Sequence, residues 1–359
     1  MSNQAKALVI LSPGFPKDEA DTTCVTAQQI FVKALKEINP GLHIIVLAFQ
    51  YPFQSAQYQW HGVNVMAFGG KNRGGLLRLY NWMRVWLTLR KLKKQYQLIG
   101  LLSFWLGECA FIANNFAKRK GLKHFCWLLG QDARPKNKYF RRTKPDAGSL
   151  IALSDFVAEE FSKNYGVVPK YTIPPGIDPG LFKPFSKGKR DIDVLGAGSL
   201  IPLKQYELFI SFINMLHRYV PNINAVICGD GPELERLQSL IKDLGLENNV
   251  LLMGEMPHSA VLALMQRSKL FLHTSAYEGF GVVCLEALYA GAQVVSTVQP
   301  MKTRTKNWHI VHRQLDMAHK LKELLEDRHI KYTPVLPYAV NDSARAITKL
   351  FGYNDDAIS

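Results

Sequence analysis

Short runs of β-branched and apolar residues alternate with helical patterns from one end of this chain to the other. The predicted strands of the first half are residues 7–11, 43–48, 63–68, 98–103, 124–129 and 150–153. Those of the second half are residues 192–196, 225–228, 250–253, 270–273 and 293–296. Strands that alternate with helices form parallel sheets with helices on both faces. We therefore expect an α/β protein with doubly wound parallel sheets.

The length of the chain, 359 residues, exceeds that of a typical single domain. A polar stretch with proline and glycine, residues 183–190, separates the two series of strands and indicates a linker. We predict a first domain over residues 1–184 and a second over residues 188–337. Residues 341–351 have the pattern of one last capped helix.

The composition argues against several classes of protein. Hydrophobic and charged fractions of 47% and 20% are those of a globular chain. The five cysteines include no C-x-x-C pair, which argues against a disulfide framework or a structural zinc site. The apolar stretch 98–113 is interrupted by Glu108 and too short to span a membrane, and the run 7–11 is too short for a signal peptide. We expect a cytoplasmic protein.

The positive charge is concentrated in the first half of the chain. Residues 1–186 contain 25 Lys and Arg against 11 Asp and Glu, whereas residues 187–359 contain 19 against 18. Residues 71–144 alone contain 18 basic and 2 acidic residues. This asymmetry indicates an anionic partner, which could be nucleic acid, an anionic membrane or a phosphorylated substrate. The alternative is a basic face that only keeps the protein soluble.

Residues 76–94 are predicted to contain a basic amphipathic helix. Its apolar and aromatic residues are interleaved with basic ones: Leu79, Tyr80, Trp82, Met83, Trp86 and Leu89 with Arg78, Arg84, Arg90, Lys91, Lys93 and Lys94. Helices of this composition lie on membrane surfaces, where each basic residue near anionic lipid contributes about 1 kcal/mol. The alternative is that the apolar stripe packs on a sheet.

The segment from Leu270 to Gly291 is the most informative part of the sequence. A strand enters a glycine-containing turn, and a helix is predicted from near Gly281 to Gly291. The free amides of Phe280, Gly281 and Val282 would then point off a helix N-terminus, which suits a phosphate or diphosphate.

Glu286 is an anomaly within that helix, which is otherwise apolar all round and should be buried. A buried carboxylate without a partner costs several kcal/mol, so Glu286 needs one. Two hydroxyl donors of a ribose would satisfy it. The alternative is a salt bridge to a neighbouring basic residue of the protein.

Two further strand ends have glycines and are expected at the same edge of the second sheet. One runs through Gly198 and Ser199 to Lys204, and the other contains Gly229. Nucleotides bind at the carboxyl edge of open parallel sheets, and a lysine there can neutralise a diphosphate leaving group. The alternative for Lys204 is an ordinary surface lysine.

Together these motifs resemble the retaining glycosyltransferases of family 4, which have the GT-B fold. The pair in Glu278-Gly-Phe-Gly-x4-Glu286 resembles that family's signature, and the segment Ile173-Pro-Pro-Gly-Ile-Asp178 precedes it in the expected order. The resemblance is strong over about residues 165–297. It implies two Rossmann-like domains with a cleft between them, the donor on the second domain and the acceptor on the first. The last helix, within residues 341–359, would complete the first domain.

The resemblance also implies roles for single residues. Glu286 would bind the ribose, Glu278 the donor sugar and Lys204 the diphosphate. The glycine-rich segments and the helix start would complete the donor side, together with the first loop of the chain: Gly198, Ser199, Gly229, Phe280, Gly281, Val282 and Gly14. Gly130 and Asp132 match a Gly-x-Asp of the first domain and would lie on the acceptor side or in the cleft. The family requires no metal, and no cofactor is expected besides the nucleotide-sugar co-substrate.

The chain departs from the family pattern at four places. Ser199 stands where an arginine is usual, and Leu129 stands where a histidine is usual. The first loop, around Gly14, lacks a second glycine, and Gln299-Pro300-Met301 replaces a glycine pair. These departures concern which donor sugar the protein binds and whether its catalytic machinery is complete. Asp191-Ile192-Asp193 superficially resembles a metal motif of another glycosyltransferase fold, but it opens a strand and is interpreted as structural.

The predicted function is retaining transfer of a sugar from a nucleotide-diphosphate sugar to an acceptor hydroxyl, on a saccharide or a lipid-linked envelope intermediate. Residues 76–94 could place the protein on an anionic membrane, at the inner face of the cell membrane. Two alternatives remain: another GT-B enzyme, such as an NDP-sugar epimerase or a phosphorylase, or a basic nucleic-acid-binding module. No nucleic-acid-reading motif is present, so a nucleic-acid partner is not expected.

Overall fold

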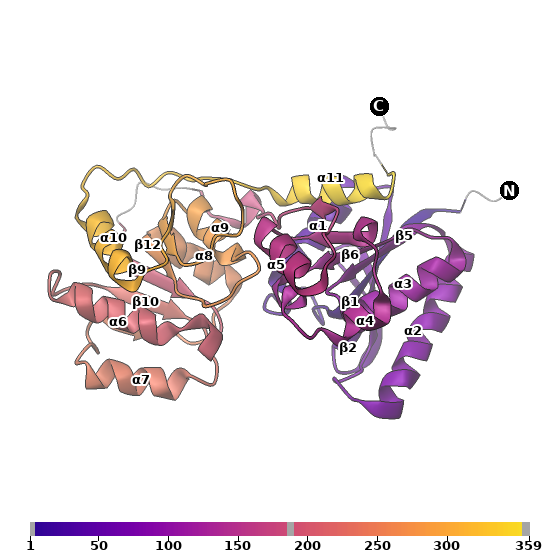
Figure 1. The fold of residues 1–359 in the computed structure, drawn as a ribbon, viewed down its shortest axis with the longest axis horizontal. Coiled ribbons are helices and arrows are strands. Elements are labelled where there is room, and N and C mark those ends of the chain that lie inside the picture. Colours follow the sequence, from indigo (N-terminus) through magenta and orange to yellow (C-terminus); the bar gives the residue numbers. More distant parts are fainter. Residues whose placement is uncertain (1–3, 185–189, 354–359) are drawn as a thin grey trace. The chain divides into compact units, whose positions relative to one another are not determined.

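The computed structural model describes residues 4–184 and 190–353 (Figure 1). Its contacts divide the chain into two compact units, which we call unit 1 (Met1–Gly176 with Ala339–Ser359) and unit 2 (Ile177–Tyr338). The boundary therefore comes earlier than the predicted residue 184, because Phe182 packs on the ring of Tyr289 and the carbonyl of Lys183 accepts a hydrogen bond from Gln266. Residues 185–189 of the predicted linker lie outside the described residues.

Unit 1 contains an eight-stranded sheet in the order β3-β4-β2-β1-β5-β6-β7-β8. Only the β3–β4 pair is antiparallel among the strands described. The strands are β1 (Lys6–Gly14), β2 (His43–Tyr51), β3 (Ser55–Trp60), β4 (Val63–Phe68), β5 (Gln97–Phe104), β6 (His124–Leu128), β7 (Leu150–Ala152) and β8 (Tyr171–Thr172). The central strand β1 is almost completely buried, as expected of a strand covered on both faces.

The helices of unit 1 are α1 (Thr26–Ile38), α2 (Gly75–Gln95), α3 (Glu108–Lys120), α4 (Lys138–Thr143), α5 (Asp155–Tyr165) and α11 (Val340–Leu350). The last helix, α11, lies beside α1 (yellow in Figure 1). Phe351 follows it and packs edge-on against Phe125, with ring centroids 5.0 Å apart. A Cβ at Gly100 would lie only 2.4 Å from the Phe351 ring, so a glycine is needed for this contact. The C-terminal helix thus belongs to unit 1.

Unit 2 contains a six-stranded, all-parallel sheet in the order β11-β10-β9-β12-β13-β14. Its strands are β9 (Ile192–Ala197), β10 (Ala225–Cys228), β11 (Val250–Leu252), β12 (Ser268–His273), β13 (Gln293–Ser296) and β14 (Trp308–Ile310). Its helices are α6 (Tyr206–His217), α7 (Leu234–Asp243), α8 (His258–Arg267), α9 (Val282–Tyr289) and α10 (Gln314–Glu326). The parallel sheets with intervening helices confirm the predicted α/β class.

All eleven predicted strands are present, and β4, β10 and β13 have the predicted bounds. Three strands were not predicted, β3, β8 and β14, because each is short or largely exposed and has no buried apolar run. Helix α7 begins at Leu234, after the turn that contains Pro232. Within the described residues, no helix combines the length and the apolar character needed to cross a bilayer.

Candidate functional site

The carboxyl edge of the unit 2 sheet brings two glycine loops into direct contact. Gly198 and Gly229 have φ angles of +147° and +144°, which favour glycine. A Cβ at Gly229 would lie 2.0 Å from the carbonyl oxygen of Gly198, so the two loops can only approach this closely without a side chain. The amide of Leu200 donates to the carbonyl of Asp230 (2.9 Å). Ser199, between these contacts, is exposed.

Lys204 and Glu278, 74 residues apart in the chain, meet at this edge. Lys204 ends the short 3-10 helix Pro202–Lys204, and its Nζ lies 2.6 Å from Oε2 of Glu278. The Thr274 hydroxyl donates to the carbonyl of Lys204 at 2.8 Å, which holds the lysine backbone against the end of β12. The structure therefore brings together the residues predicted to bind the diphosphate and the donor sugar.

His273, at the end of β12, extends this pair. Its Nε2 lies 3.8 Å from Oε2 of Glu278, and its side chain is 4% exposed. Burial alone would raise the pKa of Glu278, but the nearby His273 and the charge of Lys204 outweigh burial and lower that pKa to about 2. Burial lowers the pKa of His273. Glu278 is thus ionised at neutral pH, and the buried His273 lies beside it.

Glu286 has a protein partner that the sequence did not identify. The carboxylate is buried, and its Oε1 lies 2.7 Å from Nε2 of His258, the first residue of α8. Burial alone would lower the pKa of His258, but the hydrogen bond and the charge of Glu286 raise it. The stated alternative for Glu286, a pairing with a basic residue of the protein, is therefore present at one of its two oxygens. Its Oε2 has no hydrogen-bond partner among the described residues and can accept one from a ligand.

The N-terminus of α9 lies beside Glu278 and His273. Gly281 is the N-cap in a left-handed conformation (φ +80°), and a Cβ there would be 3.7 Å from Glu278 Cγ and 3.9 Å from His273 Cε1. The amides of Phe280, Gly281 and Val282 donate to no other described residue. The side chain of Phe280 is buried and contacts the rings of Trp308 and Tyr338. Its backbone amide, and not its side chain, can therefore bind a ligand.

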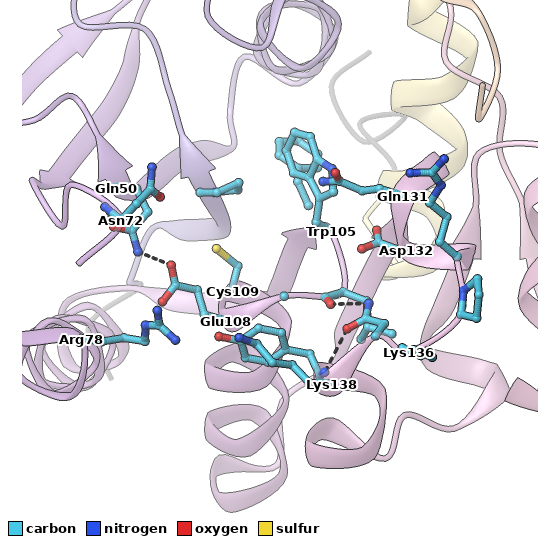
Figure 2. Close-up of a pocket in the computed structure, with 18 residues that line it drawn as sticks. Gln50, Asn72, Arg78, Trp105, Glu108, Cys109, Gln131, Asp132, Lys136 and Lys138 are labelled. Carbon is cyan, nitrogen blue, oxygen red and sulfur yellow. Dashed lines mark hydrogen bonds between the residues drawn. The ribbon is translucent and has the colours of Figure 1, made fainter. Parts of the chain in front are cut away.

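A second candidate site lies at the carboxyl ends of β1, β5 and β6 in unit 1. Figure 2 shows this pocket, which has a volume of ≈ 470 Å³ and is lined by Asp132. Asp132 belongs to the 3-10 helix Gly130–Ala133, and one carboxylate oxygen accepts from the amide of Leu129 at 2.9 Å. Burial raises the pKa of Asp132 to about 7, although backbone hydrogen bonds oppose the shift.

Gly14 is not among the residues that the structure brings together in unit 2. It is the buried last residue of β1 in unit 1, and it pairs with Tyr51 of β2. The predicted loop therefore begins later than expected, because β1 extends through Gly14.

Sequence reasoning did not assign Glu108, Lys136 and Lys138 to a site, yet all three line the unit 1 pocket with Asp132. A signal was present: Glu108 and Asp132 are the two acidic residues of the basic segment 71–144, and both lie in this pocket.

Asp191 and Asp193 are engaged in ion pairs within unit 2. Asp191 lies 2.5 Å from Arg267 Nη2, and Asp193 lies 2.7 Å from Lys269 Nζ. This agrees with the structural interpretation of the pair. In the part of the chain that the structure describes, no group of three or more His, Cys, Asp or Glu side chains could hold a metal ion.

Helix α2 divides into two differently exposed faces. Val85, Leu89 and Leu92 are buried against the unit 1 core, as the packing alternative predicted. Large apolar side chains, most of them in the N-terminal half of the helix, are nevertheless exposed: Leu76 (83%), Leu77 (55%), Leu79 (55%), Tyr80 (56%), Met83 (51%) and Leu87 (51%). An apolar surface of this kind is typical of an interaction site.

The second half of the chain matches a known protein family. Residues 180–333 match the family described as Glycosyl transferases group 1. One component of the phosphatidylinositol N-acetylglucosaminyltransferase of Arabidopsis thaliana is 30% identical over 165 residues, which are 45% of this chain and 37% of that protein. A GDP-mannose-dependent alpha-(1-6)-phosphatidylinositol monomannoside mannosyltransferase of Mycolicibacterium smegmatis is 28% identical over 54% of this chain and 57% of its own length. The matches thus span less than two thirds of either relative.

Solved structures resemble the whole chain. HepE of Anabaena, crystallised with UDP and glucose, has a TM-score of 0.65 and 18% identity over 97% of this chain and 96% of its own. WaaG, a glycosyltransferase involved in lipopolysaccharide biosynthesis, has a TM-score of 0.60 and 16% identity over 96% and 95%. As the resemblance to family 4 implied, the chain has the GT-B fold of these structures, and its residues 180–333 belong to the glycosyl transferases group 1.

Proposed function

We propose that this protein transfers a sugar, with retention of configuration, from a nucleotide-diphosphate sugar to an acceptor hydroxyl. The observation that supports it most is the Lys204–Glu278 ion pair beside the open N-terminus of α9. In the reaction the bond between the sugar C1 and the diphosphate breaks, and a bond between C1 and the acceptor oxygen forms. The acceptor proton passes to the leaving phosphate, so the residues of the chain need not supply a base.

In this proposal the nucleotide diphosphate lies against the carboxyl edge of unit 2. Lys204 and the amides at the start of α9 stabilise the charge that develops on the diphosphate. Glu278, held ionised by its neighbours, binds hydroxyls of the donor sugar. Glu286 accepts from the ribose through Oε2 while His258 holds Oε1. No resident metal is needed, and EDTA should leave the rate of transfer unchanged.

The acceptor is proposed to lie on unit 1 and to be part of a lipid-linked or envelope saccharide. Two observations support this: the exposed apolar side chains of α2, and the concentration of basic residues in segment 71–144. The Arabidopsis and Mycolicibacterium relatives are named for phosphatidylinositol-based acceptors. Residues 76–94 would then hold the enzyme on the inner, anionic face of the cell membrane.

Donor binding can be tested by thermal shift with UDP-, GDP-, ADP- and dTDP-sugars. A ligand present at 100 times its Kd stabilises the protein by about 2.7 kcal/mol, which is readily detected. The variant Glu286→Ala should lose the shift, whereas Glu323→Ala, at an exposed carboxylate of α10, should retain it. An unchanged nucleotide affinity in Glu286→Ala would contradict the assignment.

The reaction type requires product analysis. With donor and acceptor together, the product should have the anomeric configuration of the donor, as measured by NMR. Conversion of the nucleotide sugar to an isomer without acceptor would indicate an epimerase instead, and phosphate-dependent release of a sugar phosphate would indicate a phosphorylase.

A further inference from the structure

The unit 1 pocket is strongly basic at the carboxyl edge of the sheet. Pro13 at the end of β1, the segment 104–109 after β5 and the segment 131–139 after β6 line it, together with α2 (Figure 2). Its lining includes four cationic side chains: Arg78, Arg134, Lys136 and Lys138. They come from separate segments of the chain, so the pocket forms only in the folded unit.

The two carboxylates of the pocket leave most of this charge unbalanced. Glu108 accepts from the Gln50 side chain through Oε1 and from Trp82 Nε1 at 2.6 Å through Oε2, so both its oxygens are occupied. Asp132 is 4% exposed, and its raised pKa leaves it only partly ionised near neutral pH. Among the described residues, no ion pair joins Arg78, Lys136 or Lys138 to a carboxylate. The pocket is therefore suited to an anion.

A second, apolar pocket shares Arg78 with the first. It has a volume of ≈ 630 Å³ and is lined by α2 residues, by Phe111 of α3 and by Arg142. Trp82 joins the two pockets, because its ring packs against Phe111 with centroids 5.4 Å apart while its N–H donates to Glu108. Leu76 and Leu79 also line this apolar pocket and are 83% and 55% exposed.

We propose that the basic pocket binds the phosphate or diphosphate group of a lipid-linked acceptor, and that the start of the lipid chain lies in the apolar pocket on α2. Arginine matches phosphate oxygens through paired N–H groups, and lysine adds point charges. The basic pocket is large enough for such a group, since ligand pockets begin at about 300 Å³. The adjoining apolar wall distinguishes a lipid phosphate from a free one. This inference rests on the proposed function, because it names the acceptor of that reaction.

Isothermal titration calorimetry with geranyl diphosphate and with inorganic diphosphate tests the proposal. The titrations use the full chain with Lys204→Gln, so that the lysine of unit 2 contributes no diphosphate binding. Adding Lys136→Gln and Lys138→Gln should weaken binding of geranyl diphosphate by about tenfold or more, because two charge-assisted contacts are lost. The matched control, Lys118→Gln with Lys120→Gln at the far end of α3, removes the same charge and should change binding less than about twofold. None of the four lysines is buried, so the fold should be unaffected, which thermal melting checks.

The contribution of the lipid chain is measured by comparing the affinities of the two probes. Geranyl diphosphate should bind about tenfold more tightly than inorganic diphosphate, and Leu79→Ser should reduce that difference. An equal loss of affinity in the two double-lysine variants would overturn the basic pocket as the binding site, because it would show that binding depends only on net charge. Equal affinity for both probes would overturn the lipid-linked acceptor in favour of a free phosphate. Nucleotide-sugar binding is measured separately on the natural chain. A lack of nucleotide-sugar binding would contradict the proposed function, but it would not change the results with the two diphosphate probes.

Discussion

The two units share one architecture but build their candidate sites in opposite ways. In unit 2 the site consists of contacts within the fold: the loops of Gly198 and Gly229 touch, and Lys204 and Glu278 form a partly buried ion pair. In unit 1 it consists of cations and exposed leucines around a pocket. A parallel sheet thus supplies a carboxyl edge in both units, but Lys204 of unit 2 pairs with a carboxylate of its own unit, whereas Lys136 and Lys138 of unit 1 are exposed.

This difference determines what substitutions should do. A change in the unit 2 site removes contacts that also stabilise the fold, so chemistry and stability should change together. A change at the exposed surface of unit 1 should alter binding and leave stability nearly constant. Matched substitutions in the two units test this contrast.

The largest effect is expected for Lys204→Gln in unit 2. Loss of the cation that stabilises the leaving diphosphate should lower kcat about 10²–10³-fold. Melting temperature should also fall, because Glu278 loses the partner that helps to keep it ionised. Lys242→Gln, at an exposed position of α7, is the control and should change neither quantity. A kcat within threefold of the natural protein would remove Lys204 from the catalytic machinery.

The next largest effect is expected for Gly229→Ala. The new Cβ would collide with the Gly198 carbonyl oxygen, and the backbone has a φ that disfavours alanine, so stability should fall by about 3 kcal/mol in denaturant unfolding. Gly245→Ala has a positive φ of +65° with nothing within 4 Å of the new Cβ, and should cost only about 1 kcal/mol. Equal costs would show that loop contact does not organise the unit 2 edge.

On unit 1, Leu76→Ser with Leu79→Ser should weaken binding to anionic phosphatidylglycerol vesicles by about 30-fold, since each leucine loses about 1–2 kcal/mol of apolar transfer. The melting temperature should not change, because both side chains are exposed. The matched control is Leu251→Ser with Leu315→Ser, at two exposed leucines of unit 2 (54% and 62%). Equal vesicle binding by both variants in a sedimentation assay would contradict the membrane role of α2.

The smallest effect is expected for the pH dependence of the His258–Glu286 pair. Glu286 raises the pKa of His258, so the stability that the pair contributes is complete below the ordinary value of about 6.5 and is lost as pH rises through the raised pKa. His258→Gln should therefore cost about 1–2 kcal/mol at pH 5.5 and much less at pH 9. Melting curves across that range provide the measurement, with His319→Gln, exposed on α10, as the control. A difference independent of pH would exclude a charged pair.

Much of unit 2 could be predicted from the sequence because its signals are local. Glycine after a buried strand predicted the loops of Gly198 and Gly229, and a glycine-containing turn before an apolar run predicted the buried helix that contains Glu286. The edge strands β3, β8 and β14 could not be predicted, because their pairing depends on a neighbouring strand and not on a buried apolar run.

What the sequence determined by itself is the alternation of strands and helices, and with it the α/β class and the carboxyl edges where ligands bind. These follow from periodicity and from glycines within a few residues. Only the tertiary structure showed that His258 pairs with Glu286 and that separate segments build one basic pocket, whereas the resemblance already implied that the C-terminal helix completes the first domain. The physical reason is distance along the chain: a local pattern reports which face of an element is buried, whereas the order of strands in the sheet decides which distant residues meet.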